Sequence, residues 1–310
     1  MKYLIRTPIS FVIFLFIWHI LFIPAQTLAE KPVNVAVSIL PQKYFVEKIG
    51  GNRVAVSVMV LPGTNPATYE PKPRQMVNLA RTQIYFAIGV PFEDNWLQKF
   101  EASNPQMKII RTQAGIRKIP MKEGGHGHNI EHGETEHDHE KISPSAKDPH
   151  IWLSPPLVMV QAESIRDALV KADPKGRMVY EANYRAFLSE LKILDLEIRN
   201  VFETTGENNK FMVYHPSWGY FARNYGLEQI PIELEGKKPS PRQLLKLIKE
   251  ARKNHIKVIF VQPQFSEKSA ETIADAIGGQ VVFANPLAED WKNNLLKVSE
   301  KFKSAVTTDR

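Results

Sequence analysis

The sequence predicts an α/β protein with two parallel-sheet (β/α)4 lobes joined by a long rigid backbone helix. In two separate stretches of the chain, runs rich in β-branched residues alternate with helical patterns. One unusually long helical pattern lies between these stretches. Strands that alternate with helices predict parallel sheets with helical crossovers, because a parallel pair of strands needs a long connection.

The first alternation occupies residues 30–120, the expected N-terminal lobe. It begins with the strand pattern VNVAVSI (33–39), followed by a helical pattern that ends at Gly50 and Gly51. The later strand patterns are VAVSVMVL (54–61), IYFAIGV (84–90) and MKIIRT (107–112), each separated from the next by a helical pattern.

Residues 149–206 form the expected inter-lobe segment. One helix is expected to begin near Pro155, and a longer one to run from the capping residue Asp173 to Gly206. Its apolar residues recur at three- and four-residue steps, and at 1.5 Å per residue the helix would be roughly 45 Å long. The alternation resumes in residues 207–310, the expected C-terminal lobe, whose last helix should begin near Glu289.

The amino terminus has the pattern of an export signal. Lys2 and Arg6 precede an apolar run, and Thr27 and Ala29 are the small residues of a cleavage site. Residues 1–29 are therefore expected to be a signal peptide cut after Ala29, although an uncleaved membrane anchor is the alternative. Cleavage would remove two basic residues and no acidic ones, which lowers the formal net charge from +7 to +5.

Residues 121–148 form an insertion that is rich in histidine and acidic residues. Imidazole and carboxylate groups suit borderline divalent metals such as zinc, but this stretch has no apolar periodicity with which to fold around an ion. It is expected to be a flexible accessory loop, and the alternative is a merely solvated polar loop. Its histidines are His126, His128, His132, His137 and His139.

A working site is expected at the carboxyl ends of the strands, where ligands of parallel α/β sheets bind. His215 directly follows the strand pattern FMVY, and His150 lies in DPHIWLSP. Asn285 follows the pattern QVVFA, and the loop NPATYEP (65–71) follows the second strand. Since the chain has no cysteine, any metal must be held by imidazole, carboxylate, amide or water.

The chain resembles the periplasmic metal-binding proteins of zinc and manganese ABC transporters, the ZnuA-type group. The resemblance covers essentially all of the sequence after residue 29. It implies two lobes around a long helix, a metal bound between them, and delivery of that metal to a membrane permease. The motifs that carry it are TYEPKPRQM, DPHIWLSP, HPSWGYFARNYGL, ELEGKKPSPRQL and NPLAEDW.

The resemblance assigns two metal ligands, His150 and His215, and departs from the family pattern at two others. Ala67 stands where the family usually has a histidine, and Asn285 where it often has an aspartate. Alanine cannot coordinate a metal, and the neutral amide of asparagine suits hard cations better than zinc. The candidates to complete the site are Glu70, Glu233, Glu235, a histidine of the insertion, water or a chelator that arrives with the metal.

We therefore expect a non-enzymatic, monomeric, periplasmic protein that captures a divalent metal, most simply Zn2+, for an ABC permease. Mn2+, another divalent metal or a metal–chelate complex are alternatives within this class. A metallohydrolase, or a zinc-storage or adhesion protein, is the alternative outside it; the sequence contains no HExxH motif. The basic excess forms no patch with interleaved aromatics, so no nucleic-acid partner is expected. Without a cysteine at the cleavage point, no lipid anchor is expected there either.

Overall fold

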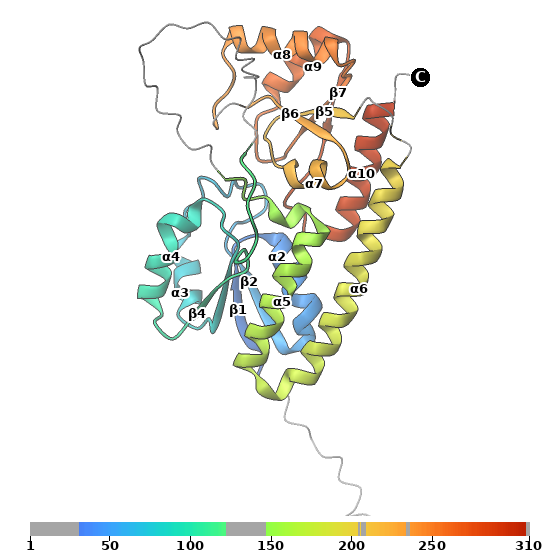
Figure 1. Ribbon diagram of the computed structural model, residues 1–310. Coiled ribbons are helices and arrows are strands. Elements are labelled where there is room, and N and C mark those ends of the chain that lie inside the picture. Colours follow the sequence, from blue (N-terminus) through green and yellow to red (C-terminus); the bar gives the residue numbers. More distant parts are fainter. Residues whose placement is uncertain (1–30, 122–146, 204, 206–208, 234–235, 308–310) are drawn as a thin grey trace, which may run out of the picture. The chain divides into compact units, whose positions relative to one another are not determined.

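Two parallel four-stranded sheets organise the protein in a computed structural model that describes residues 31–121, 147–203, 205, 209–233 and 236–307. The strand order is β2-β1-β3-β4 in the first sheet and β6-β5-β7-β8 in the second. In both sheets the first strand of the lobe therefore pairs with the second and the third. The predicted fold class, two (β/α)4 lobes around a long helix, is confirmed (Figure 1).

The N-terminal lobe follows the predicted alternation. Gly51, with a φ of 56°, ends the first helix in a backbone conformation that glycine adopts readily. In the sheet, Val35 pairs with Val56 on one side and Ile84 on the other. The elements are β1 (Val33–Val37), α2 (Leu40–Gly50), η1 (Gly51–Arg53), β2 (Val54–Val58), α3 (Pro73–Leu79), β3 (Ile84–Ala87), α4 (Phe92–Ser103) and β4 (Lys108–Arg111).

The segment between the sheets contains two long helices that pack against each other. After the short turn η2 (Ile151–Leu153) come α5 (Pro155–Ala172), η3 (Pro174–Gly176) and α6 (Arg177–Phe202). The long helix starts later than the sequence predicts, because the Asp173 carboxylate accepts the backbone N–H of Gly176 and caps a 3-10 turn first. Its 26 residues correspond to roughly 39 Å instead of 45 Å.

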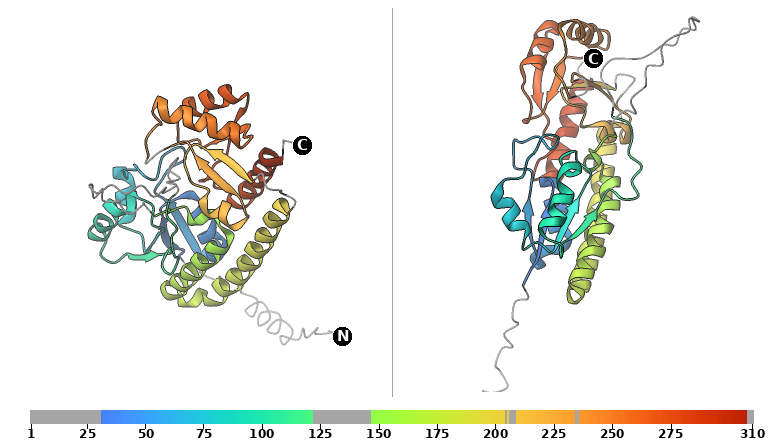
Figure 2. Two further views of the ribbon diagram at one scale, coloured as in Figure 1. Left: turned by 45° about the horizontal axis from the view of Figure 1, so that its top comes forward. Right: turned by 90° about the vertical axis from the view of Figure 1, so that its left-hand side faces the viewer.

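The C-terminal lobe repeats the alternation of strand and helix. Ser240 caps the helix α8, and Gln243 completes its capping box. In Figure 2, α8 and α9 lie along one side of the second sheet. The elements are β5 (Lys210–Val213), α7 (Gly219–Asn224), β6 (Glu228–Pro231), α8 (Pro241–Lys253), β7 (Val258–Val261), α9 (Lys268–Ile277), β8 (Gln280–Phe283) and α10 (Trp291–Thr307).

Helices α6 and α10 join the two lobes. The helix α6 packs against α2 and α5 of the N-terminal side and against α10, which in turn contacts β5 (Figure 1). Tyr180, Leu191 and Ile198 of the predicted apolar stripe are fully buried in a core that includes residues of both sheets. In the described part of the chain, no helix combines the length and the apolar character that crossing a membrane requires.

Two buried tryptophans tie the loops of the lobes together. The Trp152 indole N–H donates to the carbonyl of Pro286 at 2.7 Å, and the Trp291 indole N–H donates to the carbonyl of Trp152 at 2.8 Å. Trp291 also packs edge-on against Phe45 of α2, with ring centroids 5.0 Å apart. These three residues, Trp152, Pro286 and Trp291, are called the tryptophan bridge below.

We expect Asp173→Ala to lower the free energy of unfolding by about 1–2 kcal/mol at pH 7, the usual cost of losing a helix cap. The carboxylate also accepts the Tyr180 hydroxyl at 2.7 Å and pairs with Arg53 at 2.7 Å. Burial opposes ionisation, but the Tyr180 and Arg53 hydrogen bonds outweigh it and lower the Asp173 pKa.

A carboxyl group with a lowered pKa in the folded state stabilises the fold at pH values above its unfolded-state pKa of about 3.9. This stabilisation is lost as the pH falls through the folded-state pKa. Denaturant titrations should therefore find a smaller difference between wild type and Asp173→Ala below pH 3.9 than at pH 7. Asp167→Ala is the control, since Asp167 is an exposed ion-pair partner of Arg166 and should cost at most about 1 kcal/mol. Equal costs for the two variants would contradict the assignment.

Candidate metal centre

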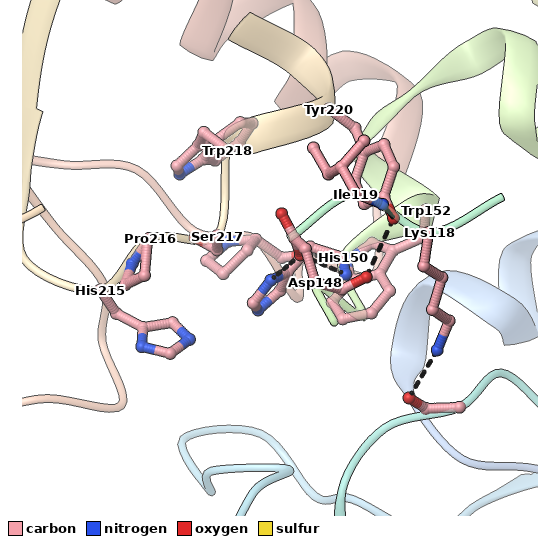
Figure 3. Close-up of polar contacts among 12 residues, drawn as sticks. Lys118, Ile119, Asp148, His150, Trp152, His215, Pro216, Ser217, Trp218 and Tyr220 are labelled. Carbon is pink, nitrogen blue, oxygen red and sulfur yellow. Dashed lines mark hydrogen bonds and ion pairs between the residues drawn. The ribbon is translucent and has the colours of Figure 1, made fainter. Parts of the chain in front are cut away.

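Two imidazole rings from distant parts of the chain lie together at the carboxyl edge of the second sheet. His150 precedes η2 and α5, whereas His215 follows β5. Their ring centroids are 5.2 Å apart and the ring planes are inclined by 72° (Figure 3). The two predicted ligand histidines are thus brought together by the fold.

The Asp148 carboxylate orients His150. One carboxylate oxygen lies 2.7 Å from the His150 Nδ1 atom and also accepts the backbone N–H of His150 at 2.9 Å. Both side chains are buried. Asp148 is itself held in place, since its backbone N–H donates to the carbonyl of Ile119 and its carbonyl accepts the Tyr220 hydroxyl (Figure 3).

The contact with Asp148 also requires a glycine on the neighbouring segment. A Cβ atom added at Gly219, where α7 begins, would lie 2.7 Å from the Asp148 carboxylate. Any side chain at this position would push the carboxylate, and with it the His150 ring, out of place. Gly219 therefore belongs to the support of the candidate metal centre.

The Glu233 carboxylate orients His215 in the same way. The His215 Nδ1 atom lies 3.0 Å from a carboxylate oxygen of Glu233, whose side chain is 5% exposed. The amide of the buried Gln262 accepts the backbone N–H of His215 and donates to its carbonyl. The His215 ring is stacked on Phe265 with centroids 4.8 Å apart.

The two carboxylates determine which ring nitrogens can bind a metal. When Nδ1 carries the proton and donates it to a carboxylate, the lone pair is on Nε2. Metal-binding histidines in proteins usually have such a carboxylate or carbonyl partner, which fixes the ring and raises its basicity. Both rings therefore have the arrangement of a zinc ligand.

Burial keeps His150 neutral. It lowers the pKa of the ring, and the nearby His215 and Lys118 lower it further, while Asp148 acts in the opposite direction. The Lys118 ammonium donates to the carbonyl of Gly89 at 3.1 Å (Figure 3). A neutral imidazole is the form that binds metal, so burial favours metal over proton at this ring.

The other predicted site residues take different positions. Ala67 and Glu70 are exposed, and the backbone N–H of Ala67 donates to the Asn65 side chain. The Asn285 side-chain oxygen already accepts the backbone N–H of Leu287 at 2.9 Å. Outside the described residues lie Glu235 and the five histidines of the insertion, His126, His128, His132, His137 and His139.

No group of three or more histidine, cysteine, aspartate or glutamate side chains that could hold a metal occurs among the described residues. Within this part of the chain, the centre consists of two imidazoles and their two carboxylate partners. The carboxylate of Glu233, a ligand candidate from the sequence, lies against Nδ1 of His215.

Sequence reasoning missed four supporting residues, Asp148, Gly219, Gln262 and Phe265. Asp148 has a local signal, because an aspartate two residues before a histidine can accept the histidine backbone N–H. Gln262 and Phe265 belong to the loop after β7, which is 47 or more residues beyond His215 in the sequence. No local pattern indicates that contact.

The sequence matches a known protein family over most of its length. A family profile described as "ZnuA: Zinc-uptake complex component A periplasmic" matches residues 35–304. The zinc-binding protein AdcA of Streptococcus pyogenes serotype M3 is 30% identical over 296 residues, which is 93% of this chain and 56% of AdcA. The chain thus spans little more than half the length of this relative. The high-affinity zinc uptake system protein ZnuA of Bacillus subtilis is 29% identical over 82% of this chain and 78% of its own length.

Solved structures agree with these sequence matches. A crystal structure of ZnuA is 44% identical, with a TM-score of 0.80 over 89% of this chain and all of that one. A zinc-bound ZnuA deletion mutant is 43% identical, with a TM-score of 0.80 over 90% of this chain and all of its own. Because the family profile matches residues 35–304, most of the chain, the chain belongs to the ZnuA family of periplasmic zinc-uptake components.

Proposed function

We propose that this protein captures Zn2+ between its lobes and delivers it to the permease of an ABC transporter. The observation that carries the proposal is the pair of imidazoles 5.2 Å apart, each with a buried carboxylate on Nδ1. Relatives named for zinc binding and zinc uptake support the choice of metal. Binding and release would involve no chemical change in a substrate.

The ligand chemistry favours zinc over harder ions. Two imidazole nitrogens suit Zn2+ and its borderline neighbours, whereas Mn2+ prefers oxygen-rich sites. Zinc in open sites commonly has three protein ligands and a water, so two imidazoles leave at least one position for another group. Glu70, Asn285, Glu235 or a histidine of the insertion are the candidates from this chain.

We also propose the domain organisation and location that the sequence predicts. Residues 1–29 would be a signal peptide cut after Ala29, residues 30–120 and 207–310 the two lobes, and residues 149–206 the segment that joins them. Residues 121–148 would be the accessory metal loop. The mature protein would act in the periplasm as a monomer.

The first test removes or adds one imidazole. His215→Ala should nearly abolish tight zinc binding, because one imidazole would remain. Ala67→His should tighten it by about tenfold or more, roughly 1.4 kcal/mol, because a third protein ligand becomes available. Affinities are measured by competition with a chromophoric zinc chelator.

Two control variants match these changes. His255→Asn removes an exposed histidine whose φ of 53° asparagine tolerates, and it should leave zinc affinity unchanged. Ala67→Leu adds bulk without a nitrogen and should not tighten binding. If His215→Ala binds zinc as tightly as His255→Asn does, the proposed site is wrong.

A second test uses pH. Both rings must be neutral to bind metal, and the ordinary pKa of histidine is about 6.5. Zinc affinity should therefore fall as the pH drops from about 7.5 to about 5.5, a range around this value. Because burial lowers the pKa of His150, that ring should stay neutral further into acid than a free imidazole. An affinity that is constant over this range, with the fold intact by circular dichroism, would contradict coordination by these imidazoles.

A third test concerns the accessory loop. Deletion of residues 121–141 should lower the number of zinc ions bound but leave the tightest site intact, because that site is assigned to His150 and His215. Calorimetry measures both quantities. A variant with serine at all five histidine positions keeps the loop length and should behave like the deletion. Loss of the tightest site in both variants would place the main site in the loop instead.

A further inference from the structure

A cavity of about 260 Å³ lies between loops of the two lobes. Its N-terminal side is formed by the loops after β1 and β2, and its C-terminal side by the loops after β7 and β8. The lining residues that matter here are Ile39, Val60, Leu61, Gln264, Asn285 and Leu287. All four loops follow the carboxyl ends of strands, where parallel α/β sheets bind ligands.

The cavity adjoins the two histidines. In the loop after β7, Gln264 lines the cavity, and the next residue, Phe265, is stacked on the His215 ring. In the loop after β8, Asn285 lines the cavity, and the next residue, Pro286, accepts the indole N–H of Trp152. The Trp152 ring lies 5.1 Å from that of His150. His215 is thus linked to the cavity wall through Phe265, and His150 is linked to it through Trp152 and Pro286.

The cavity wall is apolar apart from a few polar groups, one of which lacks a partner. The side-chain oxygen of Gln264 is buried and has no hydrogen-bond partner in the described part of the protein. Such an atom costs free energy unless it receives a hydrogen bond. A ligand in the cavity with an N–H or O–H group could donate it.

The cavity shares a loop with the position at which the family ligand is missing. Ala67, which takes the place of a family histidine, belongs to the loop after β2, and that loop also contributes Val60 and Leu61 to the cavity. The described residues supply two imidazoles, and Asn285 already uses its side-chain oxygen for the backbone N–H of Leu287. An occupant of the cavity could therefore supply the missing ligand atoms.

We propose that Zn2+ is bound together with a small chelating amino acid, of the class that includes free histidine, whose body occupies this cavity. The inference rests on the proposed function, since it completes the same metal site. The amine of the amino acid loses one proton to solvent and coordinates zinc, and its remaining N–H groups can donate to Gln264. Its imidazole or carboxylate takes the coordination position that Ala67 leaves empty.

Size and charge agree with such a ligand. At about 30 Å³ per water molecule, the cavity has the volume of roughly nine waters, which is enough for one amino acid and too little for a large chelator. Zinc with one amino-acid anion carries a single positive charge. The carboxylates of Asp148 and Glu233 lie behind the two imidazoles and favour a cation there.

The experiment is equilibrium dialysis of the full chain with radiolabelled L-histidine, with and without Zn2+. We expect about one histidine retained per protein in the presence of zinc and none in its absence. The variant His215→Ala keeps the histidine-rich insertion but lacks the proposed metal site. The label that it retains is therefore subtracted from the label retained by the wild type. In parallel, L-histidine should raise the zinc affinity of the wild type instead of lowering it by competition.

Three variants and one control identify the cavity as the place of binding. Leu61→Trp should fill the cavity and abolish retention of histidine, while Leu245→Trp, a change at an exposed leucine outside it, should not. Gln264→Leu should weaken histidine capture by about tenfold without changing the affinity for zinc alone. Ala67→His should bind zinc tightly and no longer retain histidine, because the protein then supplies the missing imidazole.

The outcomes separate this inference from the proposed function. If the wild type binds zinc through His215 but retains no histidine, and histidine only competes for the metal, the inference is wrong and the proposed function stands. If wild type and His215→Ala bind zinc equally, both are wrong. Equal retention of histidine by Leu61→Trp and Leu245→Trp would show that the cavity is not the binding place.

Discussion

The tryptophan bridge is the constraint on which the geometry of the candidate metal centre depends. Trp152 belongs to the segment that carries His150. Its indole donates to the carbonyl of Pro286 in the C-terminal lobe, and its own carbonyl accepts the indole N–H of Trp291 at the start of α10. Because Trp291 packs on Phe45 of α2, the same residues connect the helix layer of the first lobe with the loops of the second. The separation of the two imidazoles is thereby set by buried indoles and hydrogen bonds, which resist displacement more than a solvent-exposed hinge would.

The charge of the centre follows from this arrangement. Asp148 and Glu233 are both buried, and buried carboxylates require hydrogen bonds and compensating charge. Each imidazole provides one hydrogen bond to its carboxylate, but a neutral imidazole carries no positive charge that would compensate the carboxylate. A cation on the Nε2 atoms would compensate the negative charge of these carboxylates, so the same groups that orient the rings also favour a positively charged ligand. Burial of His150 acts in the same direction, because it lowers the pKa of the ring.

The sequence predicted the parts of this structure that depend on local periodicity. The strand–helix alternation and the two lobes follow from the apolar periodicity of the sequence. The convergence of His150 and His215 follows from the expectation that ligands lie at the carboxyl ends of parallel strands. The start of α6 was predicted wrongly, since the Asp173 side chain can cap a 3-10 turn as readily as an α-helix. The contacts of His215 with Glu233, Gln262 and Phe265 could not be predicted, because they join loops that approach only after both halves of the sheet have formed.

The departure from the family pattern that the sequence predicts at Ala67 would have a consequence for metal delivery as well as for capture. A site that closes around zinc with four protein ligands holds it strongly but must break several bonds before release. In the proposed site, two imidazoles, each held by its own carboxylate, would be the protein's share of the coordination, and both rings would already be oriented. A co-ligand in the adjoining cavity would raise affinity during capture and could leave with the metal, so that handover would require only two protein–zinc bonds to break. Tight capture and rapid release, which oppose each other in a closed site, would then depend on different groups.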